Sequence, residues 1–346
     1  MDQIIKFALI GCGAIAHKHV CALNRVPNAK IVGIYDDNHE VANAFSKQYS
    51  IPCFPTPEGL IREADPTILN ILTPSGYHCR DILSLVKFKK HFVVEKPLAL
   101  NLKETDRTLD TCKKSGLKVF VVKQNRFNPP IKKLKEALDI NRFGKPVLGT
   151  VRIRWSRNQA YYDKRPWRGT RELDGGIFAN QGSHHIDLLV WMMGDVDNVI
   201  ATTATRIMDI ETEDTGGALI EFKSGALGII EITTATRPKD LEGSISILGE
   251  KGSVEVGGFF ANKLKTWDFE NPHPMDNDIW EKHSTVPDER AWNHTELFKD
   301  VINSLIQETS GLIEGNDARK AVQLTDAIYQ SAHNKERVYL NQQKRK

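Results

Sequence analysis

The first 124 residues alternate short apolar runs with segments in which apolar residues recur at helical spacing. The apolar runs are continuous, as is typical of strands that are buried on both faces of a sheet. Strands that alternate with helices of this length predict βαβ units and a parallel sheet with helices on both faces. The predicted strands are Ile4–Ile10, Lys30–Tyr35, Thr67–Leu72, Phe92–Val94 and Lys118–Val122, and the predicted helices are Ala14–Arg25, Asn38–Tyr49, Tyr77–Lys87 and Leu102–Lys114.

The pattern changes after Asn125. Turn-rich segments at Glu221–Ala226 and Leu248–Gly252 each join two β-rich runs, which predicts hairpins. Proline is favoured in the first turn of a helix, so Pro129-Pro130 predicts a helix start. We therefore predict a doubly wound α/β domain over residues 1–124 and an α+β domain with a mostly antiparallel open sheet over residues 125–346. The helices expected in the second domain are Pro129–Asn141, Phe178–Met193, Glu289–Gln307 and Asp317–Asn334.

Composition narrows the class of protein. With 346 residues, 40% of them hydrophobic and 26% charged, the chain has the composition of a soluble globular protein. A net charge of +3 argues against nucleic acid or an anionic membrane as the main partner. No secretory signal pattern and no long apolar run is present. The five cysteines are odd in number and lack metal-ligand spacing, so we expect reduced thiols in a cytoplasmic protein and no metal.

A glycine-rich loop follows the first predicted strand and opens the first predicted helix. Its residues, Gly11-Cys12-Gly13-Ala14-Ile15-Ala16, match the pattern G-x-G-x-x-A. In that pattern the first glycine permits a tight turn, the second lets a pyrophosphate approach the backbone, and the last small residue lets helix and strand pack closely. The loop predicts a dinucleotide site with contacts from Gly11, Gly13, Ala14 and Ile15; the alternative is a tight turn that binds no ligand.

An acidic residue at the end of the second predicted strand indicates which dinucleotide is bound. Asp36 lies 23 residues after Gly13. A carboxylate at this place accepts hydrogen bonds from the ribose hydroxyls and repels a 2′-phosphate. We therefore expect NAD and assign Asp36 to it, with Asp37 as the competing residue if the strand ends one residue later.

A charged step, Glu95-Lys96-Pro97, follows the predicted strand Phe92–Val94. Proline favours an extended backbone at Lys96 and ends the strand, so Lys96 lies at the carboxyl end of a parallel strand, where ligands bind in such sheets. Oxidation of an alcohol needs a group that receives the hydroxyl proton. A lysine can polarise the oxygen or relay the proton. It becomes a base near neutral pH only if burial or nearby positive charge lowers its pKa. The alternative is that Glu95 and Lys96 form an exposed charged pair.

A second polar group lies in the later helix. Asn180 and His184 are four residues apart and share one face if both are helical, whereas His185 points elsewhere. Histidine is the side chain best suited to accept a proton near neutral pH, and Asp187 could orient the imidazole of His184. Packing and hydrogen bonding of a paired His-His is the alternative. A metal site is disfavoured because no set of three or four ligands has recognisable spacing.

These motifs resemble, in order, those of the Gfo/Idh/MocA oxidoreductases: Gly11–Ala16, Thr73-Pro74 followed by His78, Glu95-Lys96-Pro97, and Asn180-x-x-x-His184. The likeness spans nearly the whole chain. It implies a Rossmann domain, a mixed α/β domain and an active site between them, with Lys96 and His184 beside the reacting alcohol. The residues then assigned to the cofactor, besides those of the glycine loop and Asp36, are Thr73, Pro74, His78, Glu95, Lys96, Gln124, Asn125, Trp167 and Arg168. The family commonly has aspartate where this chain has Asn180, so Asn180 would position the substrate.

The stretch Arg152–Arg171 bears on the substrate. Guanidinium groups pair bidentately with phosphate or carboxylate oxygens, and aromatic rings stack on bases and sugar faces. A nucleotide diphosphate sugar would use this charge. Arg152 and Arg154 are explained equally well as the solvated face of a strand. The stretch contains Arg152, Arg154, Arg157, Arg165, Arg168 and Arg171, with Trp155, Tyr161, Tyr162 and Trp167 between them.

The segment from Trp155 to Gly182 is also similar to a narrower group, the dehydrogenases that oxidise the 3-hydroxyl of UDP-N-acetylglucosamine or of its uronic acid in bacterial surface-polysaccharide pathways. Their 3-keto product would go to an aminotransferase. The resemblance implies substrate contacts by Lys96, Arg157, Tyr161, Arg168, Asn180 and His184. A homo-oligomer, either dimer or tetramer, is also expected. Two alternatives stay open: a dehydrogenase of a free polyol or sugar such as an inositol, and a sensor that binds NAD or a sugar without chemistry.

Overall fold

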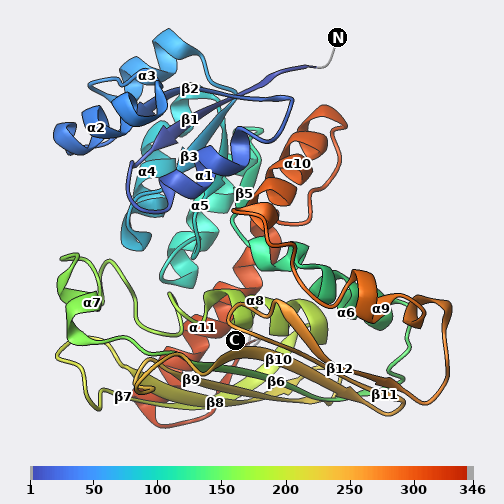
Figure 1. The fold of residues 1–346 in the computed structure, drawn as a ribbon. Helices are drawn as coiled ribbons and strands as arrows, with labels where there is room; N and C mark the ends of the chain where they lie inside the picture. The colour runs from blue at the N-terminus through green and yellow to red at the C-terminus, as the bar shows by residue number, and fades with distance from the viewer. Residues whose placement is uncertain (1–2, 341–346) are drawn as a thin grey trace. The chain divides into compact units, whose positions relative to one another are not determined.

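The computed structural model describes residues 3–340 and divides the chain into two compact units (Figure 1). The first unit comprises Met1–Gln124 and Asp288–Arg319, and the second comprises Asn125–Pro287 and Lys320–Lys346. The first segment of the first unit ends at Gln124. The segment Asp288–Arg319, which we expected in the second domain, belongs instead with the first.

The first unit is built on a parallel sheet of five strands in the order β2-β1-β3-β4-β5. Its central strands bury every residue or nearly so, in keeping with their continuous apolar sequence. Each strand end lies within one residue of the predicted end. The strands are β1 (Ile5–Ile10), β2 (Ala29–Tyr35), β3 (Ile68–Ile71), β4 (His91–Val94) and β5 (Val119–Val121).

Helices α1 to α5 connect these strands, and four of them were predicted. The helix α3 (Pro57–Ala64) was missed. Its start was encoded, because Thr56 caps it by accepting a hydrogen bond from Gly59 N at 3.0 Å and Pro57 occupies the first turn. The predicted helices are α1 (Ala16–Leu23), α2 (His39–Tyr49), α4 (His78–Leu85) and α5 (Leu102–Lys114), with short 3-10 turns η1 (Ser75–Tyr77) and η2 (Val86–Phe88) on either side of α4.

The late helix α10 (Trp292–Ile306) packs on α1 and explains why its segment joins the first unit. The ring of Phe298 lies edge-on to Phe7, with centroids 5.6 Å apart, and to His19, with centroids 5.3 Å apart. Further along, Val121 N of the edge strand β5 donates to Ile313 O at 2.9 Å. These contacts bury apolar surface that the first 124 residues do not cover by themselves.

The second unit is built on an eight-stranded sheet in the order β12-β11-β10-β6-β9-β8-β7-β13. Only β6 and β9 pair in parallel among the described strands of this sheet, so it is mostly antiparallel, as predicted. Both predicted hairpins are present, as β8–β9 and β10–β11. The strands are β6 (Pro146–Arg154), β7 (Val196–Ala204), β8 (Thr215–Phe222), β9 (Leu227–Thr233), β10 (Glu242–Gly249), β11 (Gly252–Gly257), β12 (Lys263–Phe269) and β13 (Val338–Tyr339).

Helices cover one face of this sheet and leave the other open (Figure 1). The covering helices are α6 (Pro129–Asp139), α8 (Ser183–Met193) and α11 (Gly315–Asn334), whose apolar residues join the core of the sheet. On the opposite face Leu219 and Leu227 remain 58% and 54% exposed. The remaining short elements are η3 (Gln124–Phe127), α7 (Gln159–Asp163), η4 (Pro274–Asp276) and α9 (Ile279–Lys282).

The helix expected at Phe178–Met193 begins five residues later, at Ser183. The residues before it form turns, because Gly175 and Gly176 have φ angles of +77° and +95° and Gly182 N bonds back to Ile177 O at 2.6 Å. Asn180 therefore lies in a turn and not on the helix face that carries His184.

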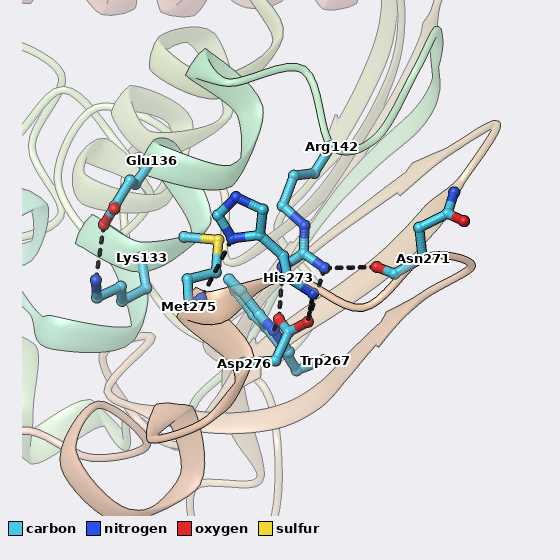
Figure 2. A network of polar contacts seen from close by, with 8 residues as sticks. All are labelled: Lys133, Glu136, Arg142, Trp267, Asn271, His273, Met275 and Asp276. Carbon is cyan, nitrogen blue, oxygen red and sulfur yellow. Dashed lines mark hydrogen bonds and ion pairs between the residues drawn. The ribbon is translucent and has the colours of Figure 1, made fainter.

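A polar network fastens the segment after β12 to the end of α6 (Figure 2). Asp276 accepts from Arg142 Nη1 at 2.5 Å and Nη2 at 2.9 Å, from Trp267 Nε1 at 2.7 Å and from His273 N at 2.8 Å. The Arg142 guanidinium also lies 3.9 Å from the centroid of Phe269. Burial acts to raise the pKa of Asp276, but these donors outweigh it and lower the pKa, so the carboxylate stays charged near neutral pH.

None of the helices in residues 3–340 is both long enough and apolar enough to cross a membrane.

Candidate active site

The glycine loop has the backbone that its sequence predicts. Gly11 has a φ of +104°, and a Cβ there would lie 2.9 Å from the carbonyl carbon and oxygen of Leu72. A Cβ on Gly13 would meet no atom within 4 Å, so the loop is open on the side where a pyrophosphate would approach. The helix α1 starts without a side-chain cap, and its first backbone N–H, that of Ala16, donates to Gly13 O at 3.0 Å. The positive end of the helix dipole therefore lies at this loop.

Asp36 follows β2 directly and faces the glycine loop. Its Oδ2 accepts from Cys12 N at 2.7 Å, and its Oδ1 accepts from Asn38 N at 2.9 Å. Burial raises the pKa of Asp36, and the two backbone donors oppose that rise. Asp37, the competing residue, is exposed. Because a carboxylate has about four acceptor sites, Asp36 retains capacity for ribose hydroxyls, which fits an NAD-type dinucleotide.

The buried side chain of His78 connects the loop after β3 to the loop after β4. This residue is 1% exposed; its Nδ1 lies 2.7 Å from Pro97 O and its Nε2 lies 2.8 Å from Thr73 O. Burial lowers its pKa, while the two carbonyl groups oppose that change. Thr73 Oγ1 donates to Asp81 Oδ2 at 2.7 Å. His78 thus positions these loops, and cofactor contact by Thr73, Pro74 and His78 stays a prediction.

Glu95 is a buried ion-pairing residue, so the reading of Glu95 and Lys96 as an exposed charged pair is wrong. Its Oε1 lies 2.9 Å from His19 Nε2, and its Oε2 accepts from Lys96 N at 3.2 Å. Burial acts to raise the pKa of Glu95, but the hydrogen bond and charge of His19 outweigh it and lower the pKa to about 2. Asn70 Nδ2 lies 3.2 Å from the other ring nitrogen of His19. The sequence analysis missed His19, although it lies on the buried face of α1.

His19, Glu95 and His294 bring three donor atoms within 4.8 Å of one another. We assign no metal to them, because His19 and Glu95 bond each other at 2.9 Å, closer than the roughly 3.3 Å between neighbouring ligands of a tetrahedral zinc ion. Burial lowers the pKa of His294 to about 3. The absence of a bound metal stays a prediction.

Gln124 and Asn125 lie in η3, which begins three residues after the end of β5. Asn125 is 2% exposed, and neither atom of its side-chain amide has a hydrogen-bond partner within residues 3–340. An unsatisfied buried amide is costly, so such a group fits a polar ligand. Its assignment to the cofactor is consistent with this geometry and stays a prediction.

Asn180 is tied to an aspartate that the sequence analysis did not single out. Its Nδ2 donates to Asp174 Oδ1, and Asp174 Oδ2 accepts from Gly169 N at 2.8 Å. Asp174 is only 2% exposed. The sequence held one signal, an acidic residue directly before Gly175-Gly176, but the contact with Gly169 depends on the fold of the loop.

The paired histidines at the start of α8 have different surroundings. His185 is fully buried against the sheet, with its ring centroid 6.0 Å from that of Trp155, and burial lowers its pKa to about 4. It is a packing residue. His184 is 9% exposed. Asp187, which we expected to orient His184, accepts from Arg126 Nε and Nη2 at 2.8 Å each, and its role toward His184 stays a prediction.

The turn that carries Asn180 is anchored by the buried Glu213 and the partly buried Tyr329. Glu213 Oε1 accepts from Ile177 N at 2.8 Å and from Tyr329 Oη at 2.7 Å. Phe178 N in turn donates to Tyr329 Oη at 3.2 Å. Burial raises the pKa of Glu213, while these donors oppose that rise. The backbone before Asn180 is therefore fixed by the side chains of Glu213, which precedes β8, and of Tyr329 on α11.

Several members of the Arg152–Arg171 stretch are structural. Arg154 pairs with Glu231 on β9, with Nε to Oε1 at 2.6 Å, which confirms its place on the solvated strand face. Trp155 is 5% exposed and stacks on Phe259 with centroids 4.6 Å apart, so it cannot stack on a ligand in this arrangement. Tyr162 is buried, and its hydroxyl lies 3.0 Å from Thr234 Oγ1. Arg165 and Arg171 are exposed.

Arg157, Tyr161 and Arg168 are brought together, and we call them the arginine cluster. Both guanidinium carbons lie over the Tyr161 ring, at 5.3 Å for Arg157 and 4.1 Å for Arg168. Arg168 Nη1 donates to Tyr161 O at 2.8 Å, and its Nε is buried with no hydrogen-bond partner within the described part of the chain. Trp167 lies beside it, with its ring 5.7 Å from the Arg168 guanidinium. A fixed donor of this kind fits an anionic ligand.

Comparison with known proteins identifies the family. Residues 5–123 match the profile described as "Oxidoreductase family, NAD-binding Rossmann fold", and residues 135–340 match "Oxidoreductase family, C-terminal alpha/beta domain". The chain belongs to the Gfo/Idh/MocA oxidoreductase family. It is thus an NAD-binding oxidoreductase with the two-domain fold expected from its motifs.

Two solved structures of this family resemble the chain over nearly its whole length. The WlbA dehydrogenase from Bordetella pertussis, in complex with NADH and UDP-GlcNAcA, is 38% identical, covers 99% of each chain and has a TM-score of 0.95. The WlbA enzyme from Chromobacterium violaceum, with the same ligands, is 37% identical, covers 99% of this chain and 97% of its own, and has a TM-score of 0.92. A myo-inositol 2-dehydrogenase from Thermotoga maritima is 27% identical over 72% of this chain and 74% of its own.

Proposed function

We propose that this protein is an NAD-dependent dehydrogenase that oxidises the 3-hydroxyl of a UDP-N-acetylated sugar, either UDP-N-acetylglucosamine or its uronic acid. The observation that carries the proposal is the 38% identity, over 99% of the chain, to a dehydrogenase crystallised with NADH and UDP-GlcNAcA. The myo-inositol enzyme matches at 27% over 72% of the chain, so a free polyol is the second candidate.

The residues that would hold NAD are those of the glycine loop and Asp36, since the loop is open at Gly13 and Asp36 keeps acceptor capacity. A bound NAD would supply the hydride acceptor for the carbon that is oxidised. A 2′-phosphate would meet the Asp36 carboxylate, so NAD is favoured over NADP.

The chain's own part in the chemistry is to bind the sugar and to move one proton. His184 takes the hydroxyl proton at a ring nitrogen, assisted by the ammonium of Lys96, which polarises the hydroxyl oxygen. Asn180 binds a sugar hydroxyl and does not titrate. The Glu95 carboxylate, which is paired with His19, accepts a hydrogen bond from the backbone N–H of Lys96 and so fixes the backbone at this residue.

The arginine cluster binds the diphosphate in this proposal. The Arg168 guanidinium contacts Tyr161 twice, at the Tyr161 carbonyl oxygen and at the Tyr161 ring. The buried Nε of Arg168, which has no hydrogen-bond partner within the described residues, is the donor that we assign to an anion. Arg157 is anchored at one nitrogen, where Nη1 donates to Asp240 Oδ1 at 3.0 Å. Pre-positioned guanidinium groups lose less entropy when they bind an anion than mobile ones do.

The open face of the eight-stranded sheet is the surface that we propose for self-association. Apolar residues align across neighbouring strands, since Leu148 pairs with Leu227 on β9 and with Leu248 on β10. Next to them lie Arg152 and Glu231, opposite in charge and paired in register. A face with both an apolar patch and both charge signs can pack against a second copy of itself.

We also propose that the protein is cytoplasmic. A downstream aminotransferase would consume its 3-keto product in surface-polysaccharide synthesis. The 3-keto group is the substrate that a transaminase needs.

The test is product formation by the purified protein. UDP-N-acetylglucosamine and its uronic acid are offered side by side with NAD and a keto-acid to reoxidise NADH. A keto-sugar from one of them supports the proposal and identifies the sugar. If neither is oxidised and myo-inositol is, the second candidate replaces the first. Arg168→Ala should raise KM for the nucleotide sugar, whereas Arg165→Ala, an exposed arginine of the same stretch, should not.

A further inference from the structure

One carboxylate links the end of the arginine stretch to the substrate-binding amide. Asp174 is 2% exposed, its Oδ2 accepts from Gly169 N at 2.8 Å, and its Oδ1 accepts from Asn180 Nδ2. Both bonds lie within the second unit. An ionised carboxylate can only accept hydrogen bonds, so the part of the amide that faces it must be the nitrogen.

We propose that Asp174 is a positioning residue, which fixes the amide of Asn180 so that its oxygen is presented to the sugar hydroxyl. The inference rests on the proposed function for the identity of the sugar. The amide oxygen then accepts from the hydroxyl of the substrate, and rotation of the amide is prevented because it would place two acceptors together. Orientation of this kind raises the rate through geometry and not through proton transfer.

The same contact explains why residue 180 is an asparagine. An aspartate there would place a second carboxylate against Asp174, and like charges in contact raise the pKa of one partner. The turn cannot relax easily, because Ile177 N and Phe178 N are held by Glu213 and Tyr329. Asn180 is therefore the uncharged counterpart that a fixed Asp174 requires.

The titratable groups around this pair determine the pH range of a test. Burial, with a smaller contribution from the charge of Asp174, raises the pKa of Tyr162 to about 12. Tyr162 therefore stays neutral between pH 5.5 and 7.5, the range of the test. Glu213 holds the preceding turn, and burial raises its pKa. His184 follows on α8, and the arginine cluster supplies the nearby permanent charge through Arg168, next to Gly169.

The decisive variants are Asn180→Asp and the exchange Asp174→Asn with Asn180→Asp. The exchange keeps one amide and one carboxylate in the same volume. The new amide at position 174 can accept from Gly169 N with its oxygen and donate to the carboxylate at position 180 with its nitrogen. The single variant leaves two carboxylates in contact, whereas the exchange restores a donor and an acceptor.

We expect kcat/KM of Asn180→Asp to be about 100-fold below that of the wild type at pH 7.5, the effect of losing a charge-assisted hydrogen bond. This deficit, taken against the wild type at the same pH, should shrink as the pH is lowered toward 5.5 and the two carboxylates share a proton. The exchange should regain most of the loss, with a pH profile parallel to that of the wild type. A single variant with wild-type kcat/KM at every pH, or an exchange no better than the single variant, would overturn the proposal.

A second measurement separates this inference from the proposed function. Thermal unfolding needs no substrate: Tm of Asn180→Asp should drop relative to the wild type at pH 7.5 and approach it at pH 5.5, and the exchange should abolish that difference. If the wild type oxidises no nucleotide sugar, the proposed function fails while the Tm pattern still tests the pair. A Tm difference that does not change with pH overturns the pairing itself.

Discussion

The carboxylate of Asp36 accepts a hydrogen bond from the backbone N–H of Cys12 at 2.7 Å, which joins the end of β2 to the middle of the glycine loop. One residue thus shapes the loop and offers oxygens to the ribose. Its neighbour Asp37 is exposed and takes no part in this contact. The two aspartates therefore form a matched pair for mutation.

Asp36→Ala should weaken NAD binding about 10- to 100-fold, because a hydrogen bond to a charged group contributes roughly 1.5–3 kcal/mol. It should also reduce the preference for NAD over NADP, since the negative charge that repels the 2′-phosphate is gone. Dissociation constants for both dinucleotides, measured by calorimetry, check this. Asp37→Ala is the control and should keep both values within about twofold; equal effects of the two variants would contradict the assignment.

Gly176→Ala should destabilise the turn before Asn180. Gly176 has a φ of +95°, and a Cβ there would lie 2.5 Å from Tyr329 Oη and 2.6 Å from Glu213 Oε1. Gly225 has a similar φ of +84°, but a Cβ there would meet nothing within 4 Å. Gly225→Ala therefore reports backbone strain alone, about 1–2 kcal/mol. Urea unfolding should show a clearly larger loss for Gly176→Ala; equal losses would mean that the anchoring residues simply move aside.

Acid should weaken the second unit through His185. Its pKa in the folded protein is about 4, lowered by burial from an ordinary value of 6.5, so the unfolded chain binds the extra proton first. The contribution of this histidine to stability is complete above pH 6.5 and is lost progressively as the pH falls toward 4. His185→Gln should lessen the pH dependence of the unfolding free energy in that window by up to about 1.4 kcal/mol per pH unit. An unchanged slope would show that His185 does not titrate on unfolding.

Charge on the open sheet face should disrupt self-association. Leu219 on β8 is 58% exposed and pairs in register with Ile229 on β9, which is 36% exposed. Leu219→Glu introduces a charge into this patch, and light scattering should then show a smaller particle than for the wild type. Leu241→Glu, at a 66% exposed leucine outside the sheet strands, is the control. A wild-type mass for Leu219→Glu would direct attention to another surface.

The sequence predicted the elements whose signals are local. Continuous apolar runs located all five parallel strands to within one residue, and glycine turns located both hairpins. The start of α8 was misplaced because helical spacing in Phe178–Gly182 was outweighed by glycines with positive φ and by bonds to Glu213 and Tyr329, which come from distant segments. Local pattern carries no information on such partners.

The candidate site divides in the same way. Gly11, Asp36 and Lys96 were singled out because their motifs place them at strand ends. Asp174 and His19 were missed, since the importance of each depends on a partner that folding brings to it, Asn180 in one case and Glu95 in the other. In the arginine stretch, composition alone could not distinguish Arg157, Tyr161 and Arg168, which the fold brings together, from Trp155 and Tyr162, which it buries.

The return of Asp288–Arg319 to the first unit has a consequence for biosynthesis. Phe7 packs edge-on against Phe298, a partner 291 positions later in the chain, with ring centroids 5.6 Å apart. While the ribosome is still making the second unit, α1 and β1 lack the helix that completes their hydrophobic core. Nascent domains generally fold as they emerge, and exposed apolar surface invites aggregation. The first unit, although its residues up to Gln124 are translated before the second unit, can complete its folding only after Asp288–Arg319 has been made.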